Sequence, residues 1–287
     1  MSKREVKYYF GRLNLMAQYE TDKEEFIING LTKGVEINIR DYKWGFYDIE
    51  KIKSDIGIFI SGYLVKYNPK RDEEVVNSDM HKLTLEEIRD SVKAKSRFLL
   101  HAKSGVIAFH PIANQIEIEQ FINNYVEIFM KAYDNFFVNA EIQIISDRFK
   151  ILEVLKDFSK IYKINIILHP SNPSLSEDWK EIDKRMKELD ISKYQEQYDV
   201  KQDKSGDNLR NDKNMRAKLT MAEDGYGKGE VTGELNDEIK TISTKDNPVI
   251  DFAPGDNSES SSVLDSLMIT ILNIFKRFES NKNEENS

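Results

Sequence analysis

The sequence predicts an α+β protein with a central mixed β-sheet, and three observations in its central region predict this class. Residues 96–101 and 106–110 flank Ala102-Lys103-Ser104-Gly105, a short polar connection that ends in glycine and is typical of a β-hairpin. Apolar residues then recur at three- and four-residue steps over 118–133, the pattern of a helix that packs on a sheet. Over 136–144, apolar and polar residues alternate, which indicates a half-buried strand.

A second helix and a further strand complete this core. Ser146 or Asp147 can cap the helix, and residues 161–168 form an apolar strand. The order strand, short helix, strand predicts a parallel pair joined by a right-handed crossover. The predicted core is therefore β-hairpin-α-β-α-β, with packed helices.

The hairpin register separates two histidines. If Phe98 pairs with Phe109, the apolar face of the hairpin points to the core, His110 lies opposite Arg97, and His101 lies beside the turn. At the rise of a β-strand the two imidazoles are then about 13 Å apart. They cannot share one metal ion in this register.

Further elements flank the core. Before it, the sequence predicts a strand over 6–16, a helix capped by Asp22, a hairpin of strands 43–52 and 56–67, and a charged connection over 70–90. After it come a charged helix from Ser176 that resumes toward Tyr198, a flexible polar loop over 199–216, small antiparallel strands over 217–222, 227–233 and 238–243, and a closing amphipathic helix over 263–278. These elements predict an α+β core domain (1–175), an extension of charged helix, polar loop and short strands (176–255), and a Ser-rich linker with the C-terminal helix and a disordered tail (256–287).

Composition limits the classes of function. The hydrophobic content of 39% is enough for a core, and the absence of cysteine excludes disulfides and thiolate metal sites. The net charge of −8, with all the excess acid after residue 175, argues against a strongly electrostatic nucleic-acid binder. No apolar run approaches the roughly 18 residues that span a bilayer. We therefore expect a cytoplasmic protein with no membrane partner.

Candidate catalytic residues lie near strand ends. His101, His110 and His169 all end predicted strands, where active sites of open sheets gather, although polar residues at such places are usually only solvated. No spacing typical of a zinc site occurs, so we expect no bound metal and no cofactor. Asp134 with Glu141 imitates part of a metal-dependent nuclease site that would use Mg²⁺ or Mn²⁺, but Gln143 stands where that chemistry needs lysine.

Residues 224–230, Asp-Gly-Tyr-Gly-Lys-Gly-Glu, have the composition of a phosphate-binding loop. Such loops run from a strand into a helix N-terminus, whereas this segment is predicted to enter another strand. A glycine-rich turn between strands is therefore the favoured interpretation.

Basic and aromatic residues indicate a candidate nucleic-acid surface. The basic residues cluster along the predicted hairpin and are Lys93, Lys95, Arg97 and Lys103. Stacking surfaces on neighbouring strands are offered by Tyr8, Tyr9, Tyr63 and Tyr67. A basic sheet face with aromatic rings is how many folds hold single strands, and a merely solvated strand face is the alternative.

Several distinctive strings resemble those of a family of bacterial proteins known only as a domain of unknown function. They are Ala94-Lys95-Ser96-Arg97-Phe98, Phe109-His110-Pro111, Ala140-Glu141-Ile142-Gln143, Leu168-His169-Pro170-Ser171-Asn172-Pro173, Met221-Ala222-Glu223-Asp224-Gly225-Tyr226-Gly227 and Asp246-Asn247-Pro248. The resemblance covers most of the chain and lends no activity, but it implies an association with mobile elements or phage defence.

The function predicted from these observations is a non-enzymatic binding or accessory protein, with nucleic acid or another protein as its partner. Two alternatives stay open. One is a metal-dependent nuclease or other hydrolase, and the other is a subunit that needs a partner for any activity.

Overall fold

The computed structural model describes most of the chain. The described residues are 5–17, 22–69, 71–88, 90–134, 138–147, 149–171, 176–254 and 260–276. They form two compact units whose segments alternate along the chain. Unit 1 comprises Met1–Met16, Lys103–Ala108 and Glu141–Ser287, and unit 2 comprises Ala17–Ala102 and Phe109–Ala140. The predicted division at residues 175 and 255 is a different one, and as a statement about independent domains it stays a prediction.

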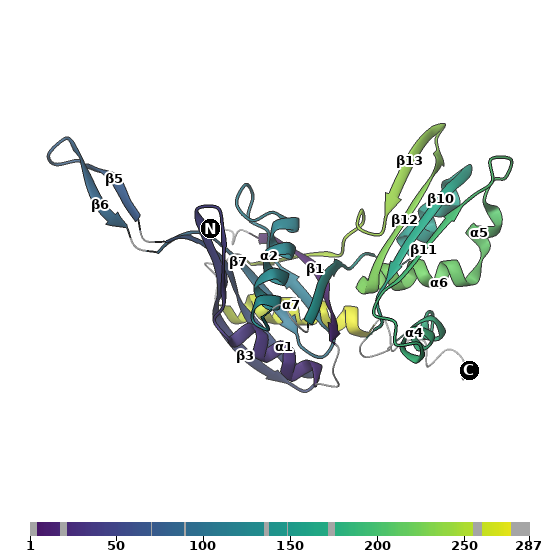
Figure 1. Ribbon diagram of the computed structural model, residues 1–287, viewed down its shortest axis with the longest axis horizontal. Helices are drawn as coiled ribbons and strands as arrows, with labels where there is room; N and C mark the ends of the chain where they lie inside the picture. The colour runs from purple at the N-terminus through teal and green to yellow at the C-terminus, as the bar shows by residue number, and fades with distance from the viewer. Residues whose placement is uncertain are drawn as a thin grey trace. The chain divides into compact units, whose positions relative to one another are not determined.

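Unit 2 contains an antiparallel sheet in which four strands follow the order β2-β3-β4-β7. The strands are β2 (Glu36–Ile39), β3 (Tyr42–Ser54), β4 (Gly57–Asn68) and β7 (Ser91–His101). The long hairpin of β3 and β4 confirms the predicted strands 43–52 and 56–67. The charged connection over 70–90 contains a two-stranded sheet of its own, β5 (Arg71–Asn77) with β6 (Lys82–Ile88), which is drawn in Figure 1.

Two helices cover one face of this sheet. Helix α1 (Lys23–Thr32) begins after Asp22, whose carboxylate accepts hydrogen bonds from the first backbone N–H groups, as predicted. Helix α2 (Ile118–Lys131) places Tyr125 against the rings of Phe46 on β3 and Phe98 on β7. The same two strands carry tyrosine and basic residues on their other face, because side chains alternate along a strand.

Unit 1 contains parts of two sheets (Figure 1). In the first, β1 (Glu5–Ala17) lies between β14 (Ile250–Pro254) and β8 (Val106–Phe109), and β9 (Val138–Ile144) also pairs with β1. Helix α7 (Ser260–Lys276) packs beside β14 and confirms the predicted closing helix. It includes residues 260–262 of the predicted linker, and the rest of that linker and the predicted tail lie outside the described residues.

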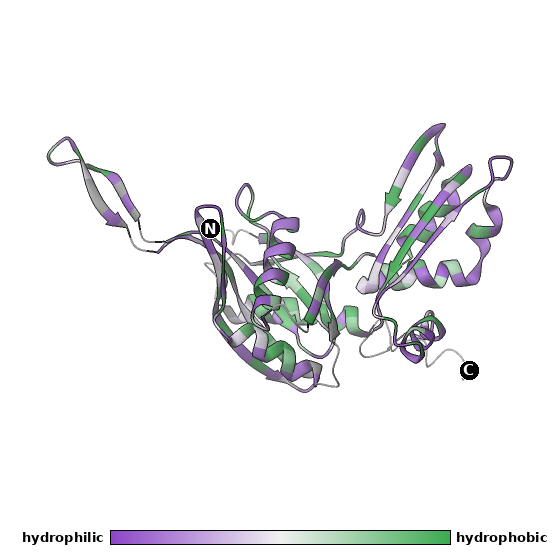
Figure 2. Cartoon of the chain, viewed as in Figure 1, coloured by the Kyte–Doolittle hydropathy of each residue, from purple (hydrophilic) through white to green (hydrophobic). Residues whose placement is uncertain are grey.

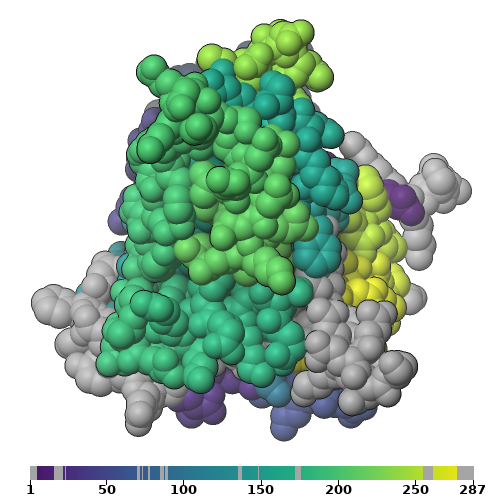
Figure 3. Space-filling model, turned by 90° about the vertical axis from the view of Figure 1, so that its right-hand side faces the viewer, coloured from purple at the N-terminus to yellow at the C-terminus, as the bar shows by residue number. Residues whose placement is uncertain are grey.

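The second sheet of unit 1 is antiparallel and follows the order β11-β10-β12-β13. Its strands are β10 (Lys160–Leu168), β11 (Tyr194–Asp199), β12 (Gly227–Leu235) and β13 (Glu238–Ser243). The helices of this part are α3 (Lys150–Asp157), α4 (Lys180–Glu188), α5 (Asp207–Asn211) and α6 (Lys213–Met221), followed by one π-helical turn, Ala222–Tyr226. Figure 3 shows the face that these segments form, coloured from teal to green.

The core of this second sheet lies between β10 and the helices. Ile164 and Leu168 of β10 pack with Leu219 of α6, Met186 of α4 and the indole of Trp179, all buried. Figure 2 shows the matching alternation of purple and green along the strands. The predicted charged helix after Ser176 thus contributes Trp179 and Met186 to this core, although Leu189 at its end is exposed.

The structure confirms the α+β class but not every predicted connection. The parallel pair of 136–144 with 161–168 is wrong, because β9 joins the sheet of β1 and β10 joins the other sheet. Residues 136–137 lie outside the described residues. The segment toward Tyr198 was predicted as a resumed helix but is strand β11, in which half-buried and exposed residues alternate.

Two further differences concern residues 199–222. The predicted flexible loop contains α5 and the start of α6, and the predicted strand over 217–222 is the end of α6 and the start of the π-helical turn. The carboxylate of Asp212 caps α6 by accepting a hydrogen bond from the Met215 N–H at 2.7 Å. This cap starts a helix inside a segment that composition alone marks as loop.

The predicted hairpin register is confirmed at its open end. The His110 N–H donates to the Arg97 carbonyl at 3.1 Å, which places these residues opposite each other. In this register the apolar face consists of Phe98, Leu100, Ile107 and Phe109, which are fully buried as predicted. Leu99 on the opposite face is equally buried. The tertiary structure thus covers both faces of the hairpin here.

Candidate functional site

Of the four predicted basic residues, three are exposed and one is buried. Lys93 and Lys95 on β7 are exposed, whereas Arg97 is only 6% exposed. Lys103 is exposed and belongs to unit 1, whereas the other three belong to unit 2. The candidate surface therefore centres on β7 and its neighbour β4.

Tyr63 of β4 organises two of these cations. The β4–β7 register puts Tyr63 opposite Arg97 and Val65 opposite Lys95, so the three polar side chains share one face. The Lys95 ammonium lies 4.5 Å from the centre of the Tyr63 ring, and the Arg97 guanidinium lies 5.2 Å from it. Arg97 Nε also donates to the Tyr63 hydroxyl at 3.1 Å. These contacts hold the ring and both cations in fixed positions.

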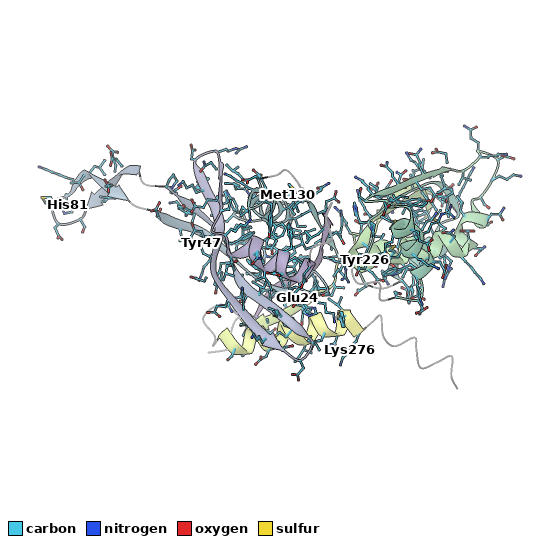
Figure 4. All side chains as sticks on the ribbon, turned by 60° about the horizontal axis from the view of Figure 1, so that its bottom comes forward. Glu24, Tyr47, His81, Met130, Tyr226 and Lys276 are labelled. Carbon is cyan, nitrogen blue, oxygen red and sulfur yellow. The ribbon has the colours of Figure 1, made fainter. Side chains whose placement is uncertain are left out.

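The same face continues onto β3 and β2. Tyr47 of β3 lies opposite Tyr63, and it is 37% exposed; Figure 4 labels it. The hydroxyls of Tyr47 and Tyr67 both donate to the carboxylate of Glu36, the latter at 2.6 Å, and the Lys43 ammonium lies 3.5 Å from the same carboxylate. We call this surface the tyrosine face; its residues are Glu36, Lys43, Tyr47, Tyr63, Tyr67, Lys95 and Arg97.

Ionisation on the tyrosine face follows from these contacts. Burial would raise the pKa of Glu36, but the hydrogen bonds from Tyr47 and Tyr67 and the charge of Lys43 lower it. Burial and the Glu36 carboxylate raise the pKa of Tyr47 and of Tyr67. At neutral pH the carboxylate is therefore ionised and the phenols are neutral, which keeps both rings oriented.

The candidate catalytic residues form a smaller group in unit 1. His169 is fully buried, and its Nδ1 lies 3.2 Å from the Ser192 carbonyl oxygen. Its Nε2 lies 3.1 Å from Glu141 Oε2 without the alignment of a hydrogen bond, and Gln143 Nε2 donates to the same oxygen at 3.0 Å. The contact with His169 lowers the pKa of Glu141, against partial burial, which raises it. Glu141 and His169 are thus brought together.

The other candidates belong to unit 2. Asp134 is exposed and belongs to unit 2, whereas Glu141 belongs to unit 1. His101 is buried, with Nε2 at 3.1 Å from the Ile56 carbonyl oxygen and its ring against Phe59. His110 is half-buried, and its backbone carbonyl accepts from the Ser96 hydroxyl. Within the described ranges, no three His, Asp or Glu residues are grouped as ligands for one metal ion.

Residues 6–272 match the family described as Domain of unknown function (DUF4747). The chain belongs to this family. The predicted resemblance to a domain of unknown function is thereby confirmed. The bacterial origin and the association with phage defence stay predictions. No curated protein matches the chain. Among the described helices of this family member, none has both the length and the apolar character needed to cross a membrane.

In this DUF4747 member the glycine-rich segment proves to be a buried structural turn rather than a phosphate loop. It leads from helix α6 into strand β12, the reverse of the order that a phosphate loop needs. Gly225 has φ +84°, and a Cβ there would lie 2.9 Å from both Arg12 Cβ and a side-chain carbon of Ile145. Only glycine fits this position without strain.

Buried polar residues that sequence reasoning missed hold this turn in place. Arg12 Nε donates to the Asp224 carbonyl at 2.8 Å, and its guanidinium lies 4.3 Å from the Tyr226 ring centre; Figure 4 labels Tyr226. Trp179 Nε1 donates to the Asp224 carboxylate at 2.9 Å. The only signal in the sequence was the unusual string of residues 221–227 itself, since partners more than 40 residues away leave no local pattern.

Proposed function

We propose that this protein binds single-stranded nucleic acid on the tyrosine face of unit 2. The observation that carries the proposal is the exposed ring of Tyr47 beside Tyr63, with the Lys95 ammonium held 4.5 Å from the Tyr63 ring. Aromatic rings on a sheet stack on bases, and lysines beside them neutralise the phosphates that follow. The tyrosine face supplies both groups on adjacent strands.

Two properties favour a single strand over a duplex. The chain carries a net charge of −8, so a long track of phosphates on a duplex would meet more repulsion than attraction. Bases in a duplex are also stacked on one another and are not available to a tyrosine ring. A few unpaired bases on Tyr47 and Tyr63, with phosphates at Lys95 and Lys43, would need only the positive charge of these two lysines.

The tyrosine face is preorganised for such binding. The Glu36 carboxylate accepts hydrogen bonds from Tyr47 and Tyr67, and Arg97 donates to the Tyr63 hydroxyl, so the rings lose little freedom when a base stacks on them. The proposal assigns no catalytic step. A part in phage defence as an accessory protein rests on the family resemblance alone and is proposed on that ground.

Fluorescence anisotropy with short labelled single- and double-stranded DNA and RNA, over a salt series with and without Mg²⁺ or Mn²⁺, tests the proposal. We expect single strands to bind more tightly than duplexes, with affinity that falls as salt rises. Tyr47→Ala should weaken binding by about 1–3 kcal/mol, the usual contribution of one stacked base. Tyr47→Phe keeps the ring and should bind nearly as wild type does. Lys95→Ala should lower the salt slope by about 1.

Lys82→Ala is the matched control for charge, because Lys82 is exposed on β6 outside the tyrosine face. Equal losses in Lys82→Ala and Lys95→Ala would mean unspecific attraction and would overturn the proposed surface. Absence of binding at low salt would overturn the function and favour a protein partner. Cleavage that requires the divalent ion and disappears in Glu141→Ala would replace the proposal by a metal-dependent nuclease.

A further inference from the structure

A hollow in unit 1 lies among helix α4, strand β11 and helix α6. Its volume is about 430 Å³, within the range of sites that hold small molecules. Its lining includes apolar residues of α4, two tyrosines of β11 and three charged residues, among them Ile182, Leu189, Tyr194, Tyr198, Arg185 and Lys218. None of these residues belongs to the tyrosine face, so the hollow is independent of the proposed nucleic-acid surface.

The floor of the hollow is a fixed polar cluster on Lys218. This lysine is 6% exposed, and its ammonium pairs with the Glu196 carboxylate. The ammonium also lies 3.1 Å from the Tyr194 hydroxyl and 3.4 Å from the Tyr198 hydroxyl. A lysine ammonium has three N–H donors, and these three acceptors use all of them. Lys218 therefore shapes the floor and is not available to a bound anion.

One cationic side chain in the lining, that of Arg185, is available to bind an anion. Arg185 is exposed at the wall of the hollow, and its guanidinium forms no hydrogen bond or ion pair with any residue that the structure describes. With Lys218 and Glu196 compensating each other, the charged lining residues leave a net charge of +1 at Arg185. Asn214, beside it on α6, adds a neutral amide that can donate or accept.

The rest of the wall is apolar and open. Leu189 is 58% exposed although it ends the apolar stripe of α4, and Ile182 and Ile191 are half-buried beside it. A second hollow of about 490 Å³ shares Ile182, Arg185, Leu189 and Asn214, so the space continues along α4. The combined shape accommodates an elongated molecule with a charged group near Arg185.

We propose that this hollow binds a small organic anion with an aromatic or aliphatic body. The anionic group would pair with the Arg185 guanidinium, which can hold a carboxylate, sulfonate or phosphate with two parallel hydrogen bonds. The body would cover Leu189 and Ile182 and contact the rings of Tyr194 and Tyr198. A single negative charge matches the net charge of +1 in the lining of the first hollow. The second hollow, where Glu181 and Glu188 offset Lys184 and Arg185, has no net charge and would hold the uncharged body.

Titration of the full chain with 8-anilinonaphthalene-1-sulfonate, an aromatic anion whose fluorescence rises in apolar surroundings, tests this site. We expect saturable binding with a stoichiometry near one. Arg185→Ala should weaken it about 10-fold through loss of a charged hydrogen-bonded pair. Leu189→Ala should weaken it about fivefold through loss of apolar contact. Lys180→Ala is the matched control, because Lys180 lies on the same helix outside both hollows and should leave binding unchanged.

A neutral probe of similar shape, N-phenyl-1-naphthylamine, separates charge from shape. It should bind more weakly than the anion and be insensitive to Arg185→Ala. Equal binding of the anion by wild type and by the Arg185→Ala, Leu189→Ala double variant, with both chains folded by circular dichroism, would overturn the site. Oligonucleotide binding should be unchanged in that double variant, so failure of this proposal and failure of the nucleic-acid proposal give different results.

Discussion

The carboxylates of Glu223 in unit 1 and Glu36 in unit 2 have opposite ionisation behaviour. Glu223 is fully buried, and burial raises its pKa to about 7, although it accepts hydrogen bonds from the backbone N–H groups of Ile151 and Phe149. Glu36 is partly exposed, and two phenols and a lysine lower its pKa. Both carboxylates accept hydrogen bonds, so the opposite directions of their pKa shifts arise from burial. Glu36 keeps contact with water, whereas Glu223 does not.

This difference indicates what polar groups do in each unit. In unit 1, Arg12, Glu223, Asp224 and Trp179 are buried and join segments that are distant in the sequence, so they act on the fold. On the tyrosine face, the hydrogen bond to Glu36 orients the ring of Tyr47, which is exposed and can act on a ligand. Substitutions in the two sets should therefore separate into losses of stability and losses of binding.

The largest loss of stability is expected for Arg12→Ala. Arg12 is 1% exposed, donates to the Asp224 and Ser104 carbonyls, and lies over the Tyr226 ring. Its removal leaves two buried carbonyl oxygens without these donors and opens a cavity, so the free energy of unfolding should fall by about 3–4 kcal/mol. Urea unfolding followed by circular dichroism measures this. A loss below about 1 kcal/mol would mean that buried polar groups of unit 1 do not support its fold.

Glu223→Gln should change how stability depends on pH. The usual pKa of 4.5 is raised to about 7 in the folded chain, so between these values the folded chain keeps a proton that the unfolded chain releases. The free energy of unfolding therefore falls as pH rises through this window, by up to about 3 kcal/mol from this group. The variant cannot ionise there and should have a shallower slope. Urea unfolding midpoints of wild type and variant, measured from pH 4.5 to pH 8, test this. Identical dependence of the midpoint on pH in the two chains would contradict the raised pKa of Glu223.

A smaller effect should separate the two tryptophans, which lie in different units. Each is 1% exposed, but Trp179 Nε1 donates to Asp224, whereas Trp44 Nε1 has no acceptor among the described residues. Trp179→Phe should therefore cost about 1–2 kcal/mol more than Trp44→Phe, beyond the similar loss of ring volume. Each variant keeps one tryptophan, so fluorescence during unfolding reports on the other unit. Equal losses of stability in the two variants would mean that the hydrogen bond from Trp179 to Asp224 does not stabilise the fold of unit 1.

The smallest change in stability is expected for Lys95→Ala on the tyrosine face. Lys95 is exposed, and its contact with the Tyr63 ring should contribute at most about 0.5–1 kcal/mol. Thermal unfolding should hardly change while oligonucleotide affinity falls. A loss of stability as large as that of Arg12→Ala would show that this surface supports the fold, and the comparison of the units would fail.

Local patterns in the sequence determined most of the elements. The polar turn ending in Gly105 gave the β7–β8 hairpin, the apolar spacing over 118–133 gave α2, and Asp22 marked the start of α1, because each depends on neighbours within about four residues. The basic and aromatic composition of β7 and β4 also predicts Lys93, Lys95, Arg97 and Tyr63 as candidates for binding.

Only the tertiary structure decided where the strands pair and which polar residues become buried. Strand β10 pairs with β11 and β12, not with β9. The alternation of apolar and polar residues along a strand predicts which side chains are buried, but it does not identify a partner strand that is distant in the sequence. The cap of α3 comes from Glu223, more than 70 residues away, while Ser146 donates instead to the Thr244 carbonyl. Tyr47 and Arg185 became candidates only from exposure and from the neighbours that the fold gives them, since a side chain acquires a binding role through its surroundings.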